Sequence, residues 1–195
     1  MERLTLAAEI EQLGDRFKAL ENTHVRYLDR KKYTIIRVDG HCFSTFTRKF
    51  NKPCDDDLSS AMIYASERWL KEFNGTCVYT QSDEATLVID EIHDDNTTGL
   101  PYNGRVEKLI TLSSSLFSVY FNDYLNSAGR QVSKLAIFDA RIFQVDTDDD
   151  VHDVIKWRQL DCFRNGISAI ARSLFSSKEL LGVSVSQMLK MIDTD

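Results

Sequence analysis

The sequence predicts an α+β fold, a ferredoxin-like sandwich in which an antiparallel sheet carries its helices on one face. Two observations lead to this class. Apolar residues gather in four short runs that are typical of strands, and they recur at helical spacing in two longer runs. Along the chain the runs follow the order strand, helix, strand, strand, helix, strand, which is the order of a ferredoxin-like sandwich.

The first strand, helix and hairpin are predicted by local patterns. Residues 33–39 form a strand, and residues 55–73 form a helix whose apolar side chains follow an acidic first turn. Residues 76–81 and 84–90 are β-rich runs on either side of Ser82-Asp83, which has the composition of a tight turn. We expect these two runs to pair as an antiparallel hairpin.

The second helix and the last strand follow the same logic. An apolar helical stripe runs over residues 104–125, and residues 135–145 form the fourth strand. A further helix begins near the acidic residues 148–150 and continues toward Leu174. Gly166 is a soft spot in that helix because glycine disfavours helix interiors.

The chain shows no low-complexity linker and no internal repeat, so we predict a single domain over residues 1–195. Residues 1–30 form a helical lead-in, and residues 147–195 form C-terminal helices. Ser184 and Gln187 fit a capping box, which predicts the start of the last helix.

The composition is that of an ordinary globular protein, with 43% apolar and 28% charged residues. Charged residues interrupt positions 1–21, so no signal peptide is predicted there, and no stretch is long enough to cross a bilayer. The four cysteines are widely spaced, which argues against a zinc site or a disulfide framework. We expect a cytoplasmic protein with no membrane partner.

Charge is distributed unevenly along the chain. The net charge is −6, but residues 26–52 carry eight Lys or Arg against Asp29 and Asp39, a local balance of +6. This basic segment could face phosphates. An exposed, solvated surface explains it equally well.

Carboxylates follow two strands that should be neighbours. Asp39 ends the first strand, and Asp83 and Glu84 lie at the turn of the hairpin. Two carboxylates from adjacent strand ends could bridge two magnesium ions about 3.5 to 4 Å apart. Gly40 lets the backbone turn sharply, so the N–H groups that follow could cradle a triphosphate. Nucleotide polymerase palms share this plan.

Each motif has a structural explanation when it is taken alone. Asp-Gly is a common turn pair and Ser-Asp suits a hairpin, so neither would by itself indicate catalysis. Their occurrence together, at two strand ends of one predicted sandwich, is more informative.

Four motifs then resemble those of the tRNA-His guanylyltransferase family, in the family order and with about the family spacing. They are YTIIRVDGHCF at 33–43, YTQSDE at 79–84, FDARI at 138–142 and WRQLDCFRN at 157–165. The resemblance covers roughly residues 13–175, which is far more specific than one short pattern.

The resemblance implies an enzyme with a polymerase-like palm that adds nucleotides to the 5′ end of tRNA or tRNA-like RNA, in the 3′-to-5′ direction. It implies two magnesium ions as cofactors and GTP or ATP as the nucleotide substrate. By resemblance, Asp39 and Asp83 hold the metal with help from the Gly40 carbonyl, and Glu84 completes the acidic site. The other residues implied to bind the nucleotide are His41, Cys42, Phe43, Lys52, Ser82, Arg105 and Lys108.

The fourth motif departs from the eukaryotic pattern. Eukaryotic members carry His-Ile-Asn-Asn where this chain has Phe163-Arg164-Asn165-Gly166, and bacterial and viral relatives more often show an Arg-Asn pair. The chain therefore resembles the branch that repairs or extends 5′ ends. Arg158 and Asn165 are weaker candidates for RNA contacts, because a buried polar helix contact would explain them nearly as well.

The resemblance leaves other functions open. We expect a homo-oligomer, a dimer or a tetramer. A non-catalytic homologue that binds nucleotide or RNA is the alternative to an enzyme, and turnover separates the two. A nucleotide cyclase on the same palm is disfavoured because the Gly-Gly-Asp/Glu-Glu-Phe signature is absent.

Overall fold

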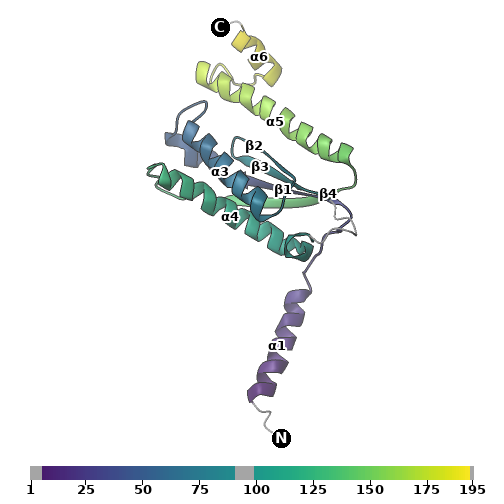
Figure 1. Ribbon diagram of the computed structural model, residues 1–195. Coiled ribbons are helices and arrows are strands. Elements are labelled where there is room, and N and C mark those ends of the chain that lie inside the picture. The colour runs from purple at the N-terminus through teal and green to yellow at the C-terminus, as the bar shows by residue number, and fades with distance from the viewer. Residues whose placement is uncertain (1–5, 91–98, 194–195) are drawn as a thin grey trace.

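The computed structural model describes residues 6–90 and 99–193, and its centre is a four-stranded antiparallel sheet. The strands are β1 (Tyr33–Gly40), β2 (Cys77–Gln81), β3 (Glu84–Ile89) and β4 (Phe138–Val145). Their order in the sheet is β2-β3-β1-β4, with β1 in the centre beside both β3 and β4 (Figure 1). The predicted ferredoxin-like α+β sandwich is confirmed.

Strand β4 begins three residues later than the sequence predicts. Asn122 on the neighbouring helix accepts a hydrogen bond from the Ala136 N–H at 2.9 Å and donates one to the Ala136 carbonyl at 2.8 Å. The backbone at Ala136 is therefore held by a side chain and not by the strand ladder.

Two long helices cover one face of the sheet, as predicted: α3 (Asp56–Glu72) and α4 (Val106–Ser127). The Asp55 carboxylate caps α3 by accepting hydrogen bonds from the N–H groups of Asp57 and Leu58. A short 3-10 helix, η2 (Pro101–Gly104), leads into α4. The core between sheet and helices is built from fully buried large side chains, including Ile36, Val38, Trp69, Phe73, Leu87, Leu109, Phe117, Phe121, Leu125 and Phe138.

The segment after β1 contains two short elements that the sequence did not predict, α2 (Phe43–Phe46) and η1 (Thr47–Lys49). Phe43 fixes this segment to the core, because its ring lies 5.7 Å from Phe121 and 5.8 Å from Phe138. Aromatic rings at these distances attract one another beyond simple area burial. Helices of one turn leave too little periodicity to be recognised from sequence.

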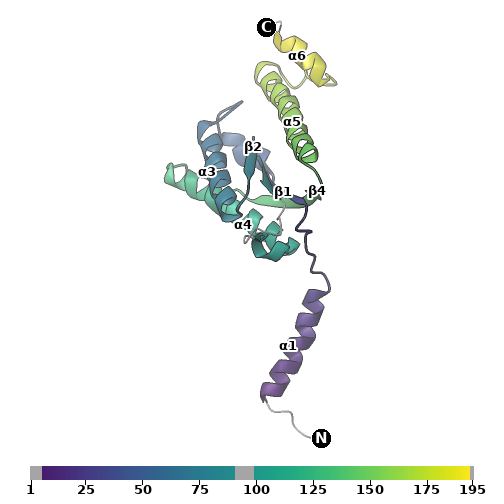
Figure 2. The same cartoon turned by 45° about the vertical axis from the view of Figure 1, so that its right-hand side comes forward.

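Helix α5 (Asp148–Leu174) packs on the opposite face of the sheet (Figures 1 and 2). Its start follows the acidic run as predicted, and Thr147 and Asp150 form a capping box there. The helix continues through Gly166 without a break. The last helix, α6 (Val185–Asp193), begins after the predicted Ser184 cap, whose N–H donates to Gln187 at 2.9 Å.

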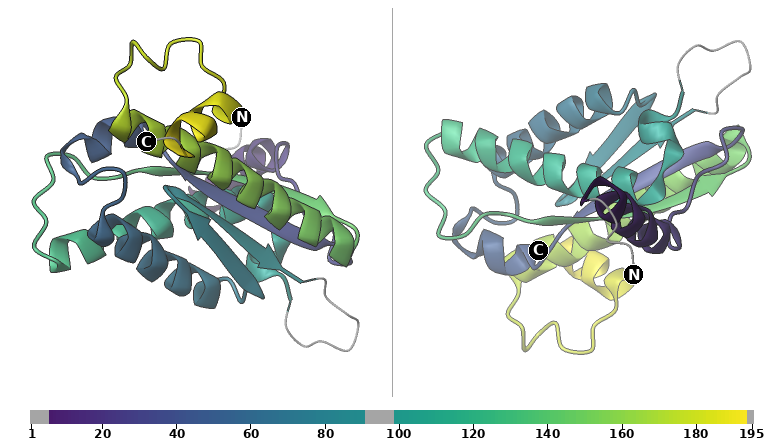
Figure 3. Two further views of the ribbon diagram at one scale, coloured as in Figure 1. Left: turned by 90° about the horizontal axis from the view of Figure 1, so that it is seen from above. Right: turned by 90° about the horizontal axis from the view of Figure 1, so that it is seen from below.

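Helix α1 (Leu6–Asn22) accounts for the predicted helical lead-in only in part, since residues 23–32 are not helical and residues 1–5 lie outside the described residues. It projects from the body of the molecule beyond the start of α4 (Figures 1 and 3). Within the part of the chain that the structure describes, no helix has the length and apolar character needed to cross a membrane.

Candidate active site

The two predicted carboxylate motifs meet at one edge of the sheet. Asp39 at the end of β1 lies opposite Glu84 at the start of β3. The Gly40 N–H donates to the Asp83 carbonyl at 3.0 Å, which joins the end of β1 to the hairpin turn. The antiparallel pairing of β1 with β3 therefore brings Asp39, Gly40 and Asp83 together as expected from the topology.

Asp83 lies in an environment that disfavours its negative charge. Burial, more than any other cause, raises the pKa of the Asp83 carboxyl above its ordinary value, and the nearby Asp39 charge adds to the rise. The Ser82 hydroxyl donates to Asp83 Oδ1 at 2.9 Å and offsets part of this effect. A cation between the two carboxylates would relieve the repulsion.

Gly40 is required by the close approach of Asp83. A Cβ atom at this position would lie 2.9 Å from Asp83 Oδ2 and 2.5 Å from Phe43 Cδ2. Any larger residue would therefore displace either the carboxylate or the aromatic ring that fixes α2 to the core.

The donor set at this edge fits magnesium. Asp39 and Asp83 supply carboxylate oxygens and Gly40 supplies a carbonyl, all of them hard ligands. Residues 6–90 and 99–193 contain no group of three or more His, Cys, Asp and Glu side chains arranged to hold a metal. Magnesium sites of this kind use one or two carboxylates and complete their shell with water and substrate phosphates.

Glu84 differs from its predicted role. Arg158 of α5 donates to both of its carboxylate oxygens, at 2.7 and 2.8 Å. A second arginine lies nearby, with Arg37 Nε 3.8 Å from Glu84 Oε2. Both oxygens are directed at arginines, so Glu84 joins β3 to α5 and is not a free third carboxylate beside Asp39 and Asp83.

Arg141 and Asp139 on β4 were missed by the sequence analysis. Asp139 lies opposite Asp39 in the sheet, and the Arg141 guanidinium lies 3.4 Å from carboxylate oxygens of both aspartates. Arg141 thus balances part of the negative charge at this edge. The signal was present in the third motif, where Asp139 and Arg141 alternate with Phe138 and Ala140 and so share one face of the strand.

The turn after Gly40 holds three of the predicted nucleotide-binding residues. The His41 N–H already donates to the Ile137 carbonyl at 2.7 Å, so a backbone cradle here could begin only at Cys42. The His41 ring Nε2 lies 3.4 Å from Cys42 Sγ. The Phe43 ring packs into the aromatic core, which leaves only its backbone available to a nucleotide.

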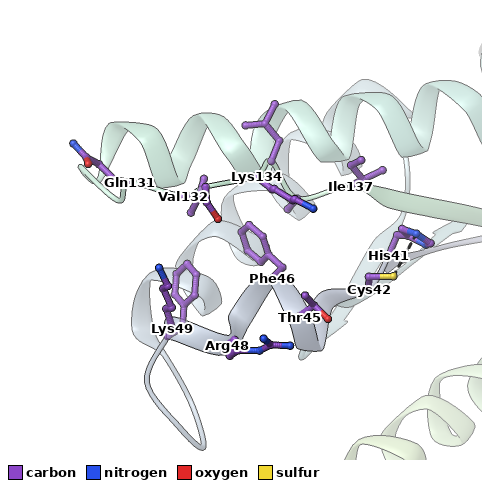
Figure 4. Close-up of a pocket in the computed structure, with 14 residues that line it drawn as sticks. His41, Cys42, Thr45, Phe46, Arg48, Lys49, Gln131, Val132, Lys134 and Ile137 are labelled. Carbon is purple, nitrogen blue, oxygen red and sulfur yellow. Dashed lines mark hydrogen bonds between the residues drawn. The ribbon is translucent and has the colours of Figure 1, made fainter.

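A pocket of about 780 Å³ opens beside this turn, between α2–η1 and the segment that precedes β4 (Figure 4). His41, Arg48, Lys49 and Lys134 supply basic groups, and Phe46 forms part of an apolar wall. None of the residues that line the pocket is acidic. Lys52 lies outside this lining, and its Nζ donates to Thr47 Oγ1 at 3.2 Å.

Arg105 and Lys108 lie at the other end of the sheet. Arg105 precedes α4 and pairs with Tyr27, just before β1 begins, whereas Asp39 lies where β1 ends. The expectation that both residues share one triphosphate site with Asp39 is therefore wrong within a single chain. Arg105 Nε instead lies 3.7 Å from Glu107 Oε2.

Arg158 is buried, with 5% of its surface exposed, so the expected contact with RNA is also wrong for this residue. It donates to Asp161 at 2.9 Å in addition to Glu84. Asn165 donates to the same Asp161 carboxylate at 3.2 Å and is exposed. The polar helix contact considered as the alternative for Arg158 is the one that the structure shows.

A ferredoxin-like palm with two aspartates at the meeting point of β1 and the hairpin defines the class of palm-type nucleotidyltransferases. The family model described as "Thg1: tRNAHis guanylyltransferase" matches residues 14–146. The chain belongs to the tRNA-His guanylyltransferase family, a family of nucleotidyltransferases.

Individual relatives agree with this placement. A bacterial tRNA-His guanylyltransferase-like protein solved in complex with ATP is 30% identical, with a TM-score of 0.87 over 94% of this chain and 79% of that chain. A similar bacterial protein solved with GTP is 31% identical, with a TM-score of 0.77 over 83% and 76% of the two chains.

An uncharacterized protein of Acanthamoeba polyphaga mimivirus is 33% identical over 204 residues, covering 94% of this chain and 70% of the viral protein. The chain spans a smaller part of the cellular enzymes. It covers 54% of the tRNA(His) guanylyltransferase of Schizosaccharomyces pombe, to which it is 31% identical over 147 residues.

Proposed function

We propose that the chain is a magnesium-dependent nucleotidyltransferase that adds nucleotides to the 5′ end of tRNA or tRNA-like RNA. The observation that carries this proposal is the meeting of Asp39 and Asp83 at the edge of the palm, with Gly40 between them. The bacterial relatives solved with ATP and GTP support a nucleoside triphosphate as one substrate.

The residues of this edge have separate tasks in the proposed reaction. Asp39, Asp83 and the Gly40 carbonyl would hold magnesium, which neutralises phosphate charge when bound. Ser82 orients Asp83 through its hydroxyl. Arg141 holds Asp39 from the side of β4 and limits the repulsion between the acids. Positioning and charge compensation are the main requirements of phosphoryl transfer.

The pocket beside His41 supports a polyanionic second substrate. The chain carries a net charge of −6, yet the pocket has basic groups, an apolar wall and no acid. Basic groups attract the phosphates of RNA, and an apolar wall suits its bases and riboses. We place the 5′ end of the RNA in this pocket, next to the carboxylate edge.

The decisive experiment measures nucleotide addition to 5′-labelled, 5′-truncated tRNAs in the presence of each nucleoside triphosphate and magnesium. Asp39→Ala and Asp83→Ala should each lower the rate by about 1,000-fold or more, because each removes a metal ligand worth several kcal/mol. Asp153→Ala, at an exposed position on α5, is the matched control and should keep full activity. Wild-type rates in either active-site variant would exclude this site.

Substrate choice follows from the fourth motif. This chain has Phe163-Arg164-Asn165-Gly166 in place of His-Ile-Asn-Asn, so we expect addition to a 5′-truncated tRNA to be at least as efficient as addition to full-length tRNA-His. Both RNAs are assayed at one salt concentration, since phosphate contacts make RNA affinity salt-dependent. A clear preference for full-length tRNA-His would assign the chain to the guanylyltransferase branch.

A non-catalytic nucleotide-binding or RNA-binding homologue is the second candidate. The altered fourth motif permits it, since Phe163-Arg164-Asn165-Gly166 stands where eukaryotic members carry His-Ile-Asn-Asn. Binding of ATP or GTP without turnover, on every RNA tested, would establish this alternative.

A further inference from the structure

One wall of the pocket beside His41 is a segment that belongs to no helix or strand. Residues 131–137, between α4 and β4, all line the pocket. Figure 4 shows this wall on one side of the pocket, with Arg48 and Lys49 on the other. Lys134 is the basic side chain that the wall contributes. Its distance from the two cations opposite therefore depends on where the backbone of the wall lies.

The wall is held mainly at its two ends. Before its first residue, Arg130 forms ion pairs with the start of α3. At its last residue, the Ile137 carbonyl accepts a hydrogen bond from the His41 N–H at 2.7 Å. Between the ends Val132 packs against the core, but among the described residues no hydrogen bond joins residues 131–135 to the rest of the chain. The contacts at the ends therefore decide where the wall lies.

Asn122 of α4 takes the place of a strand partner at the end next to β4. Its Oδ1 accepts from the Ala136 N–H at 2.9 Å, and its Nδ2 donates to the Ala136 carbonyl at 2.8 Å. The same Nδ2 donates to the Ser118 carbonyl at 2.6 Å, which fixes the orientation of the amide on its own helix. A side-chain amide offers a donor and an acceptor together, whereas a carboxylate of the same shape only accepts. Position 122 therefore requires the chemistry of an amide as well as its shape.

We propose that Asn122 is a positioning residue for the RNA pocket and that it acts through Lys134. By binding both backbone polar groups of Ala136, it fixes the wall two residues from the lysine. Asn122 is not among the residues that line the pocket, so it sets the place of Lys134 without touching the RNA. This inference rests on the proposed function, in which the pocket takes the 5′ end of the RNA.

The first test separates RNA binding from the chemical step. Asn122→Ala should raise the KM for a 5′-truncated tRNA by about tenfold, whereas kcat and the KM for the nucleoside triphosphate should stay within about threefold of the wild type. Loss of folded protein would instead lower kcat and leave KM unchanged. Asn126→Ala, at an exposed position one turn further along α4, is the matched control and should behave as the wild type.

A second variant distinguishes hydrogen bonding from the filling of space. Asn122→Asp keeps the shape of the side chain, but its carboxylate repels the Ala136 carbonyl, so the KM for RNA should rise at least as much as in Asn122→Ala. A wild-type KM in Asn122→Asp would overturn the role of the amide. Urea unfolding verifies that each variant is folded, and amide hydrogen exchange at Ala136 should be faster in both variants because the acceptor or its geometry is lost.

A double-mutant cycle tests whether Asn122 acts through Lys134. Lys134→Ala alone should raise the KM for RNA by about tenfold, but in the Asn122→Ala background it should add less than about threefold, because the displaced lysine no longer reaches its phosphate. Full additivity would overturn the proposal.

The wild type separates this inference from the proposed function in the same assay. A wild type that adds nucleotides, together with an Asn122→Ala variant that keeps the wild-type KM for RNA, would overturn the inference alone. Equal changes in Asn122→Ala and Asn126→Ala would do the same. A wild type that neither binds RNA in fluorescence anisotropy nor adds nucleotides to it would overturn the proposed function and this inference together.

Discussion

At the scale of single residues, the site depends on how closely backbone and carboxylate can approach at Gly40. The Asp83 side chain occupies the space that a Cβ atom would need, and the Phe43 ring closes the other side. The hydrogen bond from the Gly40 N–H to the Asp83 carbonyl holds the two backbones together, so neither can move away without losing it. Position 40 thus couples the metal-binding edge to the packing of α2.

Gly40→Ala should lower nucleotide addition by at least about 100-fold and destabilise the fold by about 1–3 kcal/mol, because overpacking forces Asp83 or Phe43 to move. Gly166→Ala is the control, since nothing lies within 4 Å of its Cβ position inside α5. It should raise the free energy of unfolding by about 1 kcal/mol and keep activity. Urea unfolding and the addition assay measure both variants. Full activity in Gly40→Ala would remove the steric argument.

Asp55 makes a pH-dependent contribution to stability. Burial of its carboxylate acts to raise its pKa, but hydrogen bonds from the N–H groups of Asn51, Leu58 and Asp57, together with the charge of Arg130, lower the pKa below its ordinary value of 3.8. The folded state therefore binds its proton less readily than the unfolded state. Its contribution is present above about pH 4 and is lost as pH falls through the lower, folded-state pKa.

The Asp55→Asn variant should accordingly be less stable than the wild type at neutral pH, by about 1–2 kcal/mol, and the difference should shrink below pH 4. Asparagine can still cap α3 but cannot pair with Arg130 as a charge. Urea unfolding at several pH values provides the comparison. A difference that is constant from pH 7 to pH 2 would show that the charge has no part in it.

At the scale of elements, helix α5 is fastened to the sheet by the buried pair of Arg158 and Glu84. The two parallel hydrogen bonds at 2.7 and 2.8 Å form the strong bidentate geometry of guanidinium and carboxylate. Arg37 strengthens the fastening from β1, since its guanidinium lies 5.3 Å from the Trp157 ring. The second face of the palm is thus covered by polar contacts, in contrast to the aromatic core under α3 and α4.

Arg158→Ala should destabilise the protein by about 3–5 kcal/mol, because it leaves the Glu84 carboxylate buried without its partner. Arg172→Ala, an exposed arginine on the same helix, should change stability by less than about 0.5 kcal/mol. Combining Arg158→Met with Glu84→Gln should cost less than Arg158→Ala, since the buried Glu84 carboxylate is then removed together with its arginine partner. Equal losses for the two arginine variants would show that the buried pair contributes nothing.

The sequence predicts most of these elements, but it does not predict at which end of the sheet each helix begins. The strand to Asp39 and the Ser82-Asp83 turn are local patterns, and both were recognised. The spacing of Arg105 and Lys108 predicts a shared helix face, but Arg105 is the N-cap that precedes α4. Its pairing with Tyr27 lies before β1 begins, at the end of the sheet away from Asp39. Spacing along a helix identifies a face, and strand direction decides at which end of the sheet that face begins.

At the scale of the whole molecule, charge is separated in a way that the net value of −6 conceals. Arg48 and Lys49 belong to the basic segment noted in the sequence, whereas Lys134 comes from a distant part of the chain. Only the fold brings them around one pocket, so sequence reasoning could not assign Lys134. That the 195 residues form one domain and work in the cytoplasm stays a prediction.

Lys134→Glu should weaken the binding of 5′-truncated tRNA by about tenfold and lower the slope of log affinity against log salt by about 1. The reason is the loss of one phosphate contact in the proposed RNA pocket. Lys178→Glu, which makes the same charge change at an exposed position outside the pocket lining, is the control. Fluorescence anisotropy at two salt concentrations measures both, and equal losses would indicate a general effect of net charge.

The central place of β1 in the sheet restricts how the chain can vary in length. Asp39 lies opposite Glu84 of β3 on one side and Asp139 of β4 on the other. Pairing with both strands therefore fixes which side chains of β1 face the core and which face away from it. Deleting or inserting one residue within β1 would exchange the two sides of the strand, turning Val38 outward and the acid inward. Insertions and deletions in homologues should therefore collect after the strand, in the segment from His41 to Lys52, where no pairing with a neighbouring strand fixes the number of residues.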